Sequence, residues 1–274
     1  MCTTRGMVTD LDATVDINTL NYYSPEANKQ YWSVSQFKAF DACEAAGLAS
    51  ALGVYKREDT TALLVGSYVD AYFSGTLPAF IADHPEIMKR DGSLKAEYVK
   101  AAEIIDRVES DELMSSFLKG SKQVIRTGIL FDVPWKIRMD VYDGARIVDL
   151  KVMKDMKSIY SDGFGRRSFI EHYGYDVQGA IYQRIEQISA GRDKPLPFYL
   201  AVATKEKEPD IAVIQLPQHI LDSALKMVEA KIERFDLIKQ GMVEPIRCEI
   251  CDYCKWTKRL TKPVVYDPEE WVIR

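Results

Sequence analysis

The stretch Trp135-Lys136-Ile137-Arg138-Met139-Asp140-Val141-Tyr142-Asp143-Gly144-Ala145-Arg146-Ile147-Val148-Asp149-Leu150-Lys151 decides the fold. Its Asp143-Gly144 pair stands between two runs of alternating apolar residues, which predicts a β-hairpin with a two-residue turn. In that register Asp140 faces Ile147, so Asp140 and Asp149 are diagonal neighbours on one face.

The two faces of this hairpin differ in character, because side chains alternate along a strand. The apolar face carries Ile137, Met139, Val141, Val148, Leu150 and Val152. The polar face carries Lys136, Arg138, Asp140, Asp149 and Lys151. Two carboxylates suit a divalent cation that also binds substrate phosphate, and Lys151 points the same way. Taken alone, an Asp-x-Lys pattern on a strand is more often a solvated face with a surface ion pair.

The bulk composition limits the classes of protein that the chain can belong to. Its 274 residues, 47% hydrophobic and 28% charged, suit one large globular domain with embellishments. We expect no membrane span, because no run of about 18 apolar residues occurs. The first residues lack the apolar core of a signal peptide, so we expect a cytoplasmic protein. The net charge of −5 argues against a general nucleic-acid coat, but not against an enzyme with one basic groove.

The remaining periodicities predict the order of the other elements. Ser33, with Gln36 three residues later, predicts a capping box that opens a helix. We expect 1–32 to be irregular, 78–92 to be a loop, and 154–167 to be a basic loop that either follows a phosphate backbone or is merely solvated. The predicted helices are 33–52, 61–73, 93–109, 168–190 and 217–239, and the predicted outer strands are 122–131, 196–204 and 211–216.

Three residues of the helix predicted over 168–190 share one face. Tyr175, Gln178 and Tyr182 stand at positions i, i+3 and i+7. This pattern is compatible with a substrate-facing surface and equally with an amphipathic helix that carries an aromatic stripe.

Five cysteines are present, and three of them, Cys248, Cys251 and Cys254, are separated by two residues each. In a chain without an export signal this spacing favours a metal over a disulfide. A closed metal site generally needs four ligands.

Together these motifs resemble those of a known nuclease superfamily. Asp140, followed by Asp149-Leu150-Lys151, resembles the D…(D/E)-x-K core of the PD-(D/E)XK superfamily. Gln178-x-x-x-Tyr182 is similar to the Q-x-x-x-Y motif of its RecB-like branch. In Gly66-Ser67-Tyr68-Val69-Asp70, Asp70 stands where that branch has a His. With the Ser-x-Ser-x-Phe opening at 33–37 and the Cys-rich end, the chain resembles the phage exodeoxyribonuclease VIII group, relatives of RecE, over roughly 33–255.

The resemblance implies an α/β fold with a restriction-endonuclease-like core, in which helices flank a central mixed β-sheet. The nuclease domain would span 33–255 with helical insertions and the Cys-rich end 248–254, between the irregular segment 1–32 and a tail at 256–274. It implies a Mg²⁺- or Mn²⁺-dependent exonuclease acting on linear duplex DNA in phage-type recombination. Its partners would be DNA, a single-strand annealing protein and further copies of the chain. A DNA-binding member that has lost catalysis and a restriction-type endonuclease are the alternatives.

The resemblance also implies residue roles. Metal ligands would be Asp70, Asp140, Asp149 and the Leu150 carbonyl. Lys151 would orient or deprotonate the attacking water, while Gln178 and Tyr182 help to hold that water and the substrate strand, with Tyr175 beside them. Some RecB-like nucleases hold a [4Fe–4S] cluster with one upstream and three C-terminal cysteines, which makes Cys43 the candidate fourth ligand beside Cys248, Cys251 and Cys254. Zinc and free thiols remain open, and Cys2 is expected to lie outside either arrangement.

Overall fold

A five-stranded sheet forms the centre of the molecule. The computed structural model describes residues 16–56, 60–161 and 165–263. The strands run in the order β1-β2-β3-β6-β7, and only β3 and β6 are parallel. Their bounds are β1 Ser121–Leu130, β2 Val133–Tyr142, β3 Ile147–Met153, β6 Phe198–Thr204 and β7 Ile211–Gln215. The predicted α/β fold with a central mixed sheet is confirmed.

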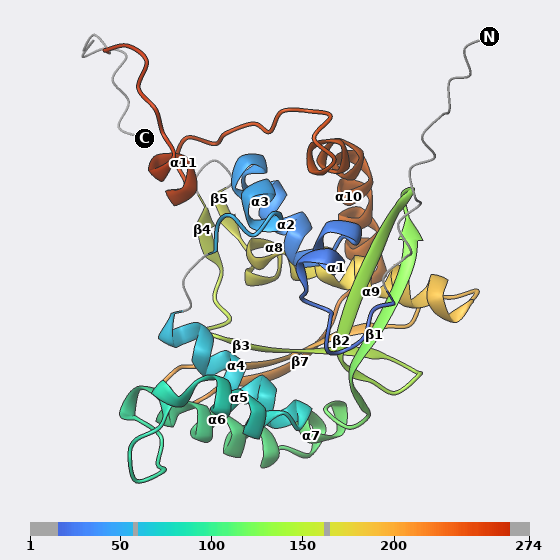
Figure 1. Ribbon diagram of the computed structural model, residues 1–274. Helices are drawn as coiled ribbons and strands as arrows, with labels where there is room; N and C mark the ends of the chain where they lie inside the picture. Colours follow the sequence, from blue (N-terminus) through green and yellow to red (C-terminus); the bar gives the residue numbers. More distant parts are fainter. Residues whose placement is uncertain (1–15, 57–59, 162–164, 264–274) are drawn as a thin grey trace, which may run out of the picture.

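Helices cover both sides of the sheet (Figure 1). One layer holds α2 Val34–Ala42, α3 Glu44–Ala51, α8 Phe169–Tyr173, α9 Tyr175–Ala190 and α10 Gln218–Lys239. Its core includes Trp32, Phe37, Trp135, Phe198 and Phe235. The other layer holds α4 Thr61–Ser74, α5 Leu77–Asp83, α6 Val99–Glu109 and α7 Glu112–Phe117. Its core includes Val69, Ile104, Val108, Leu150 and Ala203.

The predicted two-residue turn of the central hairpin is wrong. The last strand pair is Tyr142 with Ile147, so four residues form the turn. Asp143 accepts hydrogen bonds at Oδ1 from the backbone N–H groups of Ala145 (3.0 Å) and Arg146 (2.9 Å), which extends the turn beyond the Asp-Gly pair.

This longer turn changes the register by two residues. Val141 pairs with Val148, so Asp140 comes opposite Asp149 rather than diagonal to it. A shift of two residues returns every side chain to its predicted face, because side chains alternate with a period of two. The observed pairing of β2 with β3 ends at Val141 and Val148, one residue before the acidic pair.

Two predicted helices are interrupted. The helix expected over 33–52 breaks at Cys43, whose backbone is extended (φ −167°, ψ 113°), and α3 then folds back across α2. This crossing requires Gly47, because a Cβ there would lie 2.7 Å from the Phe40 backbone. The helix expected over 168–190 breaks at Gly174, whose φ of 63° suits glycine and ends α8.

Several local predictions were also incomplete. Ser33 does cap α2, but the Gln36 side chain donates to the carbonyl of Asn28 instead of closing a capping box. The segment predicted as irregular contains α1 (Pro25–Gln30), and the loop at 78–92 contains α5 and the 3₁₀ turn η1 (Pro85–Ile87). The turn η2 (Ala96–Tyr98) precedes α6, which begins later than predicted, and α7 was not predicted.

The basic segment 154–167 is not simply a loop. It carries β4 (Ile159–Ser161) and β5 (Gly165–Arg167), which pair in a small antiparallel sheet, and its residues 162–164 lie outside the described residues. The last helix is α11 (Asp252–Trp256). Cys2 and most of the predicted tail also lie outside the described residues.

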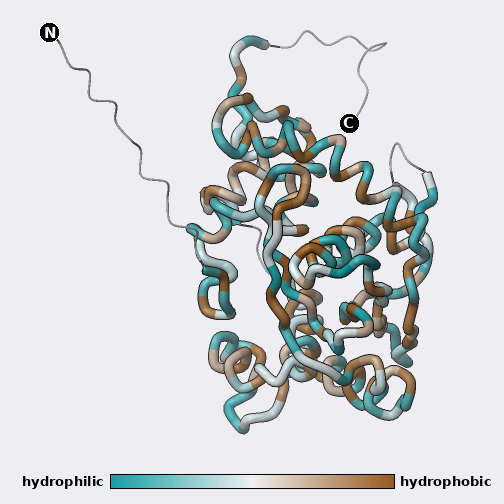
Figure 2. Tube along the Cα trace, turned by 90° about the vertical axis from the view of Figure 1, so that its right-hand side faces the viewer, coloured by the Kyte–Doolittle hydropathy of each residue, from teal (hydrophilic) through white to brown (hydrophobic). Residues whose placement is uncertain are grey.

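Over the described ranges, no helix is long and apolar enough to cross a membrane. Figure 2 shows hydrophilic and hydrophobic residues mixed along the helices, as expected for elements with one buried face.

Candidate active site and cysteine cluster

The sheet brings two acidic side chains together at its centre. Asp149 on β3 is only 1% exposed, while Asp140 on β2 is half-buried. Asp140 Oδ2 accepts a hydrogen bond from the backbone N–H of Leu150 (3.0 Å). Asp149 Oδ1 accepts from Gln178 Nε2 (2.6 Å), and its Oδ2 forms an ion pair with Lys151. Both carboxylates are thereby held in fixed orientations.

A third carboxylate approaches from α4. Burial and the charge of Asp149 raise the pKa of Asp70. Burial, together with the charges of Asp149 and Asp70, raises the pKa of Asp140 well above its usual range. Three half-buried or buried carboxylates that repel one another fit a divalent cation, which prefers oxygen ligands and would relieve the repulsion. The hydrogen bond from the Leu150 N–H to Asp140 places the Leu150 backbone beside the acidic pair.

Lys151 provides the positive charge of this group. Burial lowers the pKa of Lys151, but the neighbouring Asp149 and Asp140 outweigh burial and raise it overall. Lys151 Nζ also lies 5.2 Å from the centre of the Tyr175 ring. The side chain is therefore an ammonium group next to two carboxylates.

Helix α9 lines the other side of the site with the three residues that share its face. Gln178 binds Asp149, as described above. Tyr182 is 9% exposed, and its ring meets the Phe198 ring edge-on, with 6.3 Å between the centroids. Burial raises the pKa of Tyr175 to about 12.

Five of the predicted site residues line one cavity of about 550 Å³, whereas Asp70, Leu150 and Tyr175 are not among its lining residues. The predicted site residues in its wall are Asp140, Asp149, Lys151, Gln178 and Tyr182. Sequence reasoning gave no role to the other polar residues of the wall, which are Tyr22, Tyr23, Ser33, Ser35, Lys38 and Arg138. The position of Arg138 on the predicted polar face could have indicated its place in the site. The other five residues reach the cavity only through tertiary packing.

Two of these additional residues are basic. Burial and the neighbouring Lys151 lower the pKa of Lys38 to about 8. Lys38 Nζ lies 5.6 Å from the centre of the Tyr175 ring, the ring that Lys151 also approaches. Arg138 donates to the hydroxyl of the exposed Tyr23 (2.6 Å). The cavity therefore combines an acidic centre with a basic wall.

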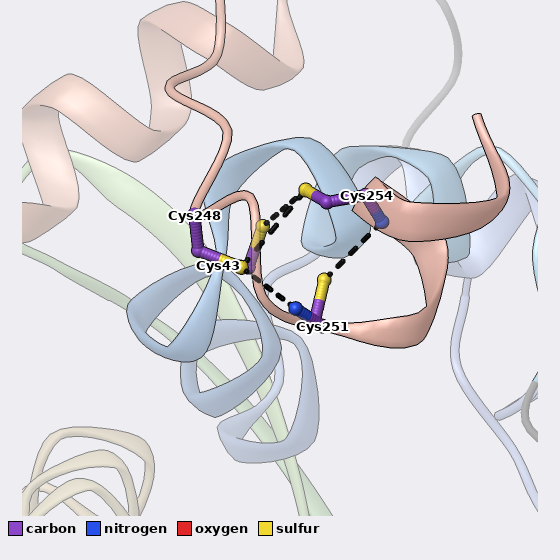
Figure 3. Close-up of side chains that lie close together, drawn as sticks. All are labelled: Cys43, Cys248, Cys251 and Cys254. Atoms are coloured by element: carbon purple, nitrogen blue, oxygen red, sulfur yellow. Dashed lines mark hydrogen bonds between the residues drawn. The ribbon is translucent and has the colours of Figure 1, made fainter. Parts of the chain in front are cut away.

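A second cluster lies apart from this cavity and contains four cysteines. Cys43 comes from the junction of α2 and α3, whereas Cys248, Cys251 and Cys254 surround the start of α11 (Figure 3). The four sulfur atoms all lie within 4.8 Å of one another. Cys43 Sγ and Cys254 Sγ are 3.6 Å apart, and all four thiols are free of disulfides.

Backbone groups point at two of these sulfur atoms. The N–H of Cys251 donates to Cys248 Sγ (3.3 Å), and the N–H of Cys254 donates to Cys251 Sγ (3.4 Å). Although burial opposes it, backbone N–H groups lower the pKa of Cys248 to about 6, which favours the thiolate, the form that binds metals. Burial and the neighbouring thiols instead raise the pKa of Cys251 to about 12. The structure thus brings together all four of the cysteines that the sequence grouped.

Comparisons with known proteins match one family and one solved structure over most of the chain. The family described as a PDDEXK-like domain of unknown function (DUF3799) matches residues 33–257. A crystal structure from Eubacterium rectale, named "Putative exonuclease", is 45% identical, covers 92% of this chain and 97% of its own, and has a TM-score of 0.87. The crystal structure of SSO0001 is 16% identical over 76% of this chain and 88% of its own, and its TM-score of 0.26 carries no structural argument. The search of the curated proteins found no match.

Proposed function

The chain belongs to the PDDEXK-like family that matches its residues 33–257, and on this premise we propose that it is a divalent-metal-dependent exonuclease of linear duplex DNA. The observation that carries the proposal is the cavity in which Asp140, Asp149, Lys151 and Gln178 meet. The family and the 45% identical neighbour support nuclease activity, and that neighbour's name supports an exonuclease.

The residues that would hold Mg²⁺ or Mn²⁺ are Asp140, Asp149, the Leu150 carbonyl and Asp70. Such an ion supplies a nucleophilic water at neutral pH and stabilises charge on the phosphate. The chain's own contribution is mainly orientation. The Leu150 N–H fixes Asp140 Oδ2, and the Gln178 amide fixes Asp149 Oδ1. A bound cation would share Asp149 Oδ2 with the ammonium group of Lys151.

Lys151 would act as a cation during the reaction. Because its two acidic neighbours raise its pKa, it keeps its proton, which suits orienting the attacking water and neutralising phosphate charge. Gln178 would hold Asp149 and the attacking water, and the hydroxyls of Tyr175 and Tyr182 would contact the substrate strand. Lys38 and Arg138 would bind phosphates on either side of the bond that is cleaved.

DNA topology tests the choice between an exonuclease and its alternatives. Purified protein with Mg²⁺ is incubated with a linear duplex and with a covalently closed circle of the same sequence. We expect mononucleotides or short products from the linear duplex and an intact circle. Cleavage of the circle would indicate a restriction-type endonuclease, and no cleavage of either DNA would indicate a binding protein without catalysis.

We further propose that the four cysteines hold one metal ion that joins the end of the chain to the junction of α2 and α3. Four thiolates at 2.3 Å from a single zinc ion lie about 3.8 Å apart in a tetrahedron. The distances of 3.6 Å between Cys43 Sγ and Cys254 Sγ and 3.9 Å between Cys248 Sγ and Cys254 Sγ are close to that value. A [4Fe–4S] cluster places each thiolate on a different iron, which requires wider separations.

Elemental analysis of anaerobically purified protein tests this metal. We expect colourless protein with one zinc per chain. The Cys254→Ser variant should contain no zinc. Brown protein with about four irons per chain would establish the iron–sulfur cluster instead. Neither metal, with four alkylatable thiols, would refute a metal at this cluster.

The resemblance to phage recombination exonucleases supports two partners, which we also propose. These are further copies of the chain in a homo-oligomer and a single-strand annealing protein that receives the resected strand. Light scattering of the purified protein tests the first proposal, since a monomer at micromolar concentration would contradict it.

A further inference from the structure

Strand β1 contains a backbone distortion that the sequence did not predict. Gln123 has a φ of 52°, in the left-handed region that side chains other than glycine rarely adopt. The other non-glycine residues with positive φ in the described ranges are Phe131 and Asp132, in the turn between β1 and β2, and Glu249, outside the strands. A distortion inside a strand is unfavourable, and such residues concentrate where they serve a function.

The distortion lies directly beside the acidic centre. Lys122 pairs with Val141 and Val124 pairs with Met139, so the residue opposite Gln123 is Asp140. The regular pairing is interrupted at this position. Gln123 Nε2 lies 3.5 Å from Asp140 Oδ1, the oxygen that the Leu150 N–H leaves free.

The oxygen at the other end of the Gln123 amide is unpaired within the part of the chain that the structure describes. This atom, Oε1, is buried and accepts no hydrogen bond from the described residues. Asp149 Oδ2 is also without a hydrogen bond but belongs to the ion pair with Lys151. A buried amide oxygen without a donor is unfavourable, so the strand distortion and the unpaired oxygen are two separate costs at one residue.

We propose that Gln123 belongs to the cation site and supplies its amide oxygen to the divalent ion or to a water bound to that ion. Amide oxygens are suitable ligands for hard cations. A neutral ligand also adds no fourth negative charge to Asp70, Asp140 and Asp149, which already repel one another. The amide N–H group faces Asp140 in the described orientation, so a flip of the amide would turn Oε1 towards the cation, which would then satisfy this oxygen. This inference rests on the metal dependence of the proposed function.

Calorimetric titration of Mg²⁺ and Mn²⁺ into DNA-free protein, with melting curves in EDTA, tests the proposal independently of cleavage. Gln123→Gly removes the ligand and relieves the positive φ, so we expect metal affinity to fall about tenfold while the Tm in EDTA rises. Gln123→Glu adds a charged ligand beside the other carboxylates. We therefore expect tighter metal binding and a lower Tm in EDTA.

Asp132→Gly is the matched control, because Asp132 has a φ of 62° but is exposed in the β1–β2 turn. It should raise the Tm in EDTA and leave metal affinity unchanged. Wild-type affinity in both Gln123 variants would overturn the assignment of Gln123 alone. Absence of metal binding in the wild-type protein would overturn the metal dependence and this inference together.

Discussion

The acidic centre and the cysteine cluster are built in different ways. Asp140 and Asp149 lie on adjacent strands and open into a cavity with polar walls. Cys43 and Cys254 are 211 residues apart in sequence, both are buried, and their sulfur atoms lie 3.6 Å apart. The acidic centre leaves space beside its oxygen atoms, whereas the four sulfur atoms of the cysteine cluster lie within 4.8 Å of one another.

This difference suits the acidic centre to catalysis and the cysteine cluster to holding the fold together. Oxygen ligands bind Mg²⁺ while leaving positions for water and phosphate, as a hydrolytic site needs. Four sulfur ligands fill a tetrahedral ion, so a metal there cannot bind substrate but can hold two segments together. Changes in the acidic centre should therefore alter the reaction, and changes in the cysteine cluster should alter stability.

The largest expected effect comes from Asp149→Asn. The amide keeps an acceptor for Gln178 but removes a charge from the centre, so we expect at least about a 10³-fold loss of DNA cleavage with a Tm in EDTA close to wild type. The matched control is Asp193→Asn on the exposed surface, which should cleave normally. An Asp149→Asn rate within tenfold of wild type would remove this residue from the catalytic group.

A large effect of another kind is expected from Cys43→Ser. Loss of one of four ligands should lower the Tm by about 10 °C, while the cleavage rate at 15 °C stays within about threefold of wild type. Melting curves and initial rates measure the two quantities. Cys2→Ser serves as the thiol control, and a selective loss of rate in Cys43→Ser without a change in Tm would contradict the division between the clusters.

A smaller effect is expected from Asp70→Asn. If Asp70 contributes a metal oxygen, the Mg²⁺ concentration for half-maximal activity should rise about fivefold to tenfold, whereas Asp83→Asn, on the exposed surface, should not change it. Because the pKa values of Asp70 and Asp140 are raised, protons should compete with Mg²⁺ as the pH falls, and they should do so at higher pH than for ordinary carboxylates. This competition should be weaker in Asp70→Asn. An unchanged metal titration would leave Asp70 without a role in metal binding.

The smallest expected effect concerns Lys38. Its pKa of about 8 means that it carries its charge below pH 8 and loses it above, so duplex affinity measured with Ca²⁺ in place of Mg²⁺ should fall about threefold between pH 7 and 9. Lys38→Arg should flatten this dependence, because arginine stays charged. Equal pH profiles for the two proteins would show that Lys38 does not contact DNA phosphate.

The sequence predicted the acidic centre better than its surroundings for a physical reason. Asp149 and Lys151 are two residues apart on one strand, so strand alternation alone places them on the same face. Their exact relation to Asp140 depended on the turn, where hydrogen bonds from two backbone groups to the Asp143 side chain added two residues. Periodicity carries no information about such a side-chain contact.

The residues that sequence reasoning missed depend on packing between distant segments. The breaks at Cys43 and Gly174 occur within patterns that read as continuous helices, and they set how α2 and α9 approach each other. Lys38 reaches the cavity because of that approach. The Lys38 side chain passes so near Gly174 that a Cβ at Gly174 would lie 3.4 Å from it. Gln123 sits on a strand whose polar residues looked ordinary in the sequence, and its backbone conformation and the unpaired oxygen of its side chain become visible only in the structure.

The most direct test of the division between the clusters follows activity and bound zinc in the same wild-type sample. Protein freed of Mg²⁺ by gel filtration into metal-free buffer without chelator is titrated with Mg²⁺, and the release of nucleotides from a linear duplex is measured beside the zinc content per chain. We expect activity to rise from the background to its full value while zinc stays constant at one per chain. Activity that follows the zinc content and does not respond to Mg²⁺ would contradict the assignment of catalysis to Asp140, Asp149 and Lys151.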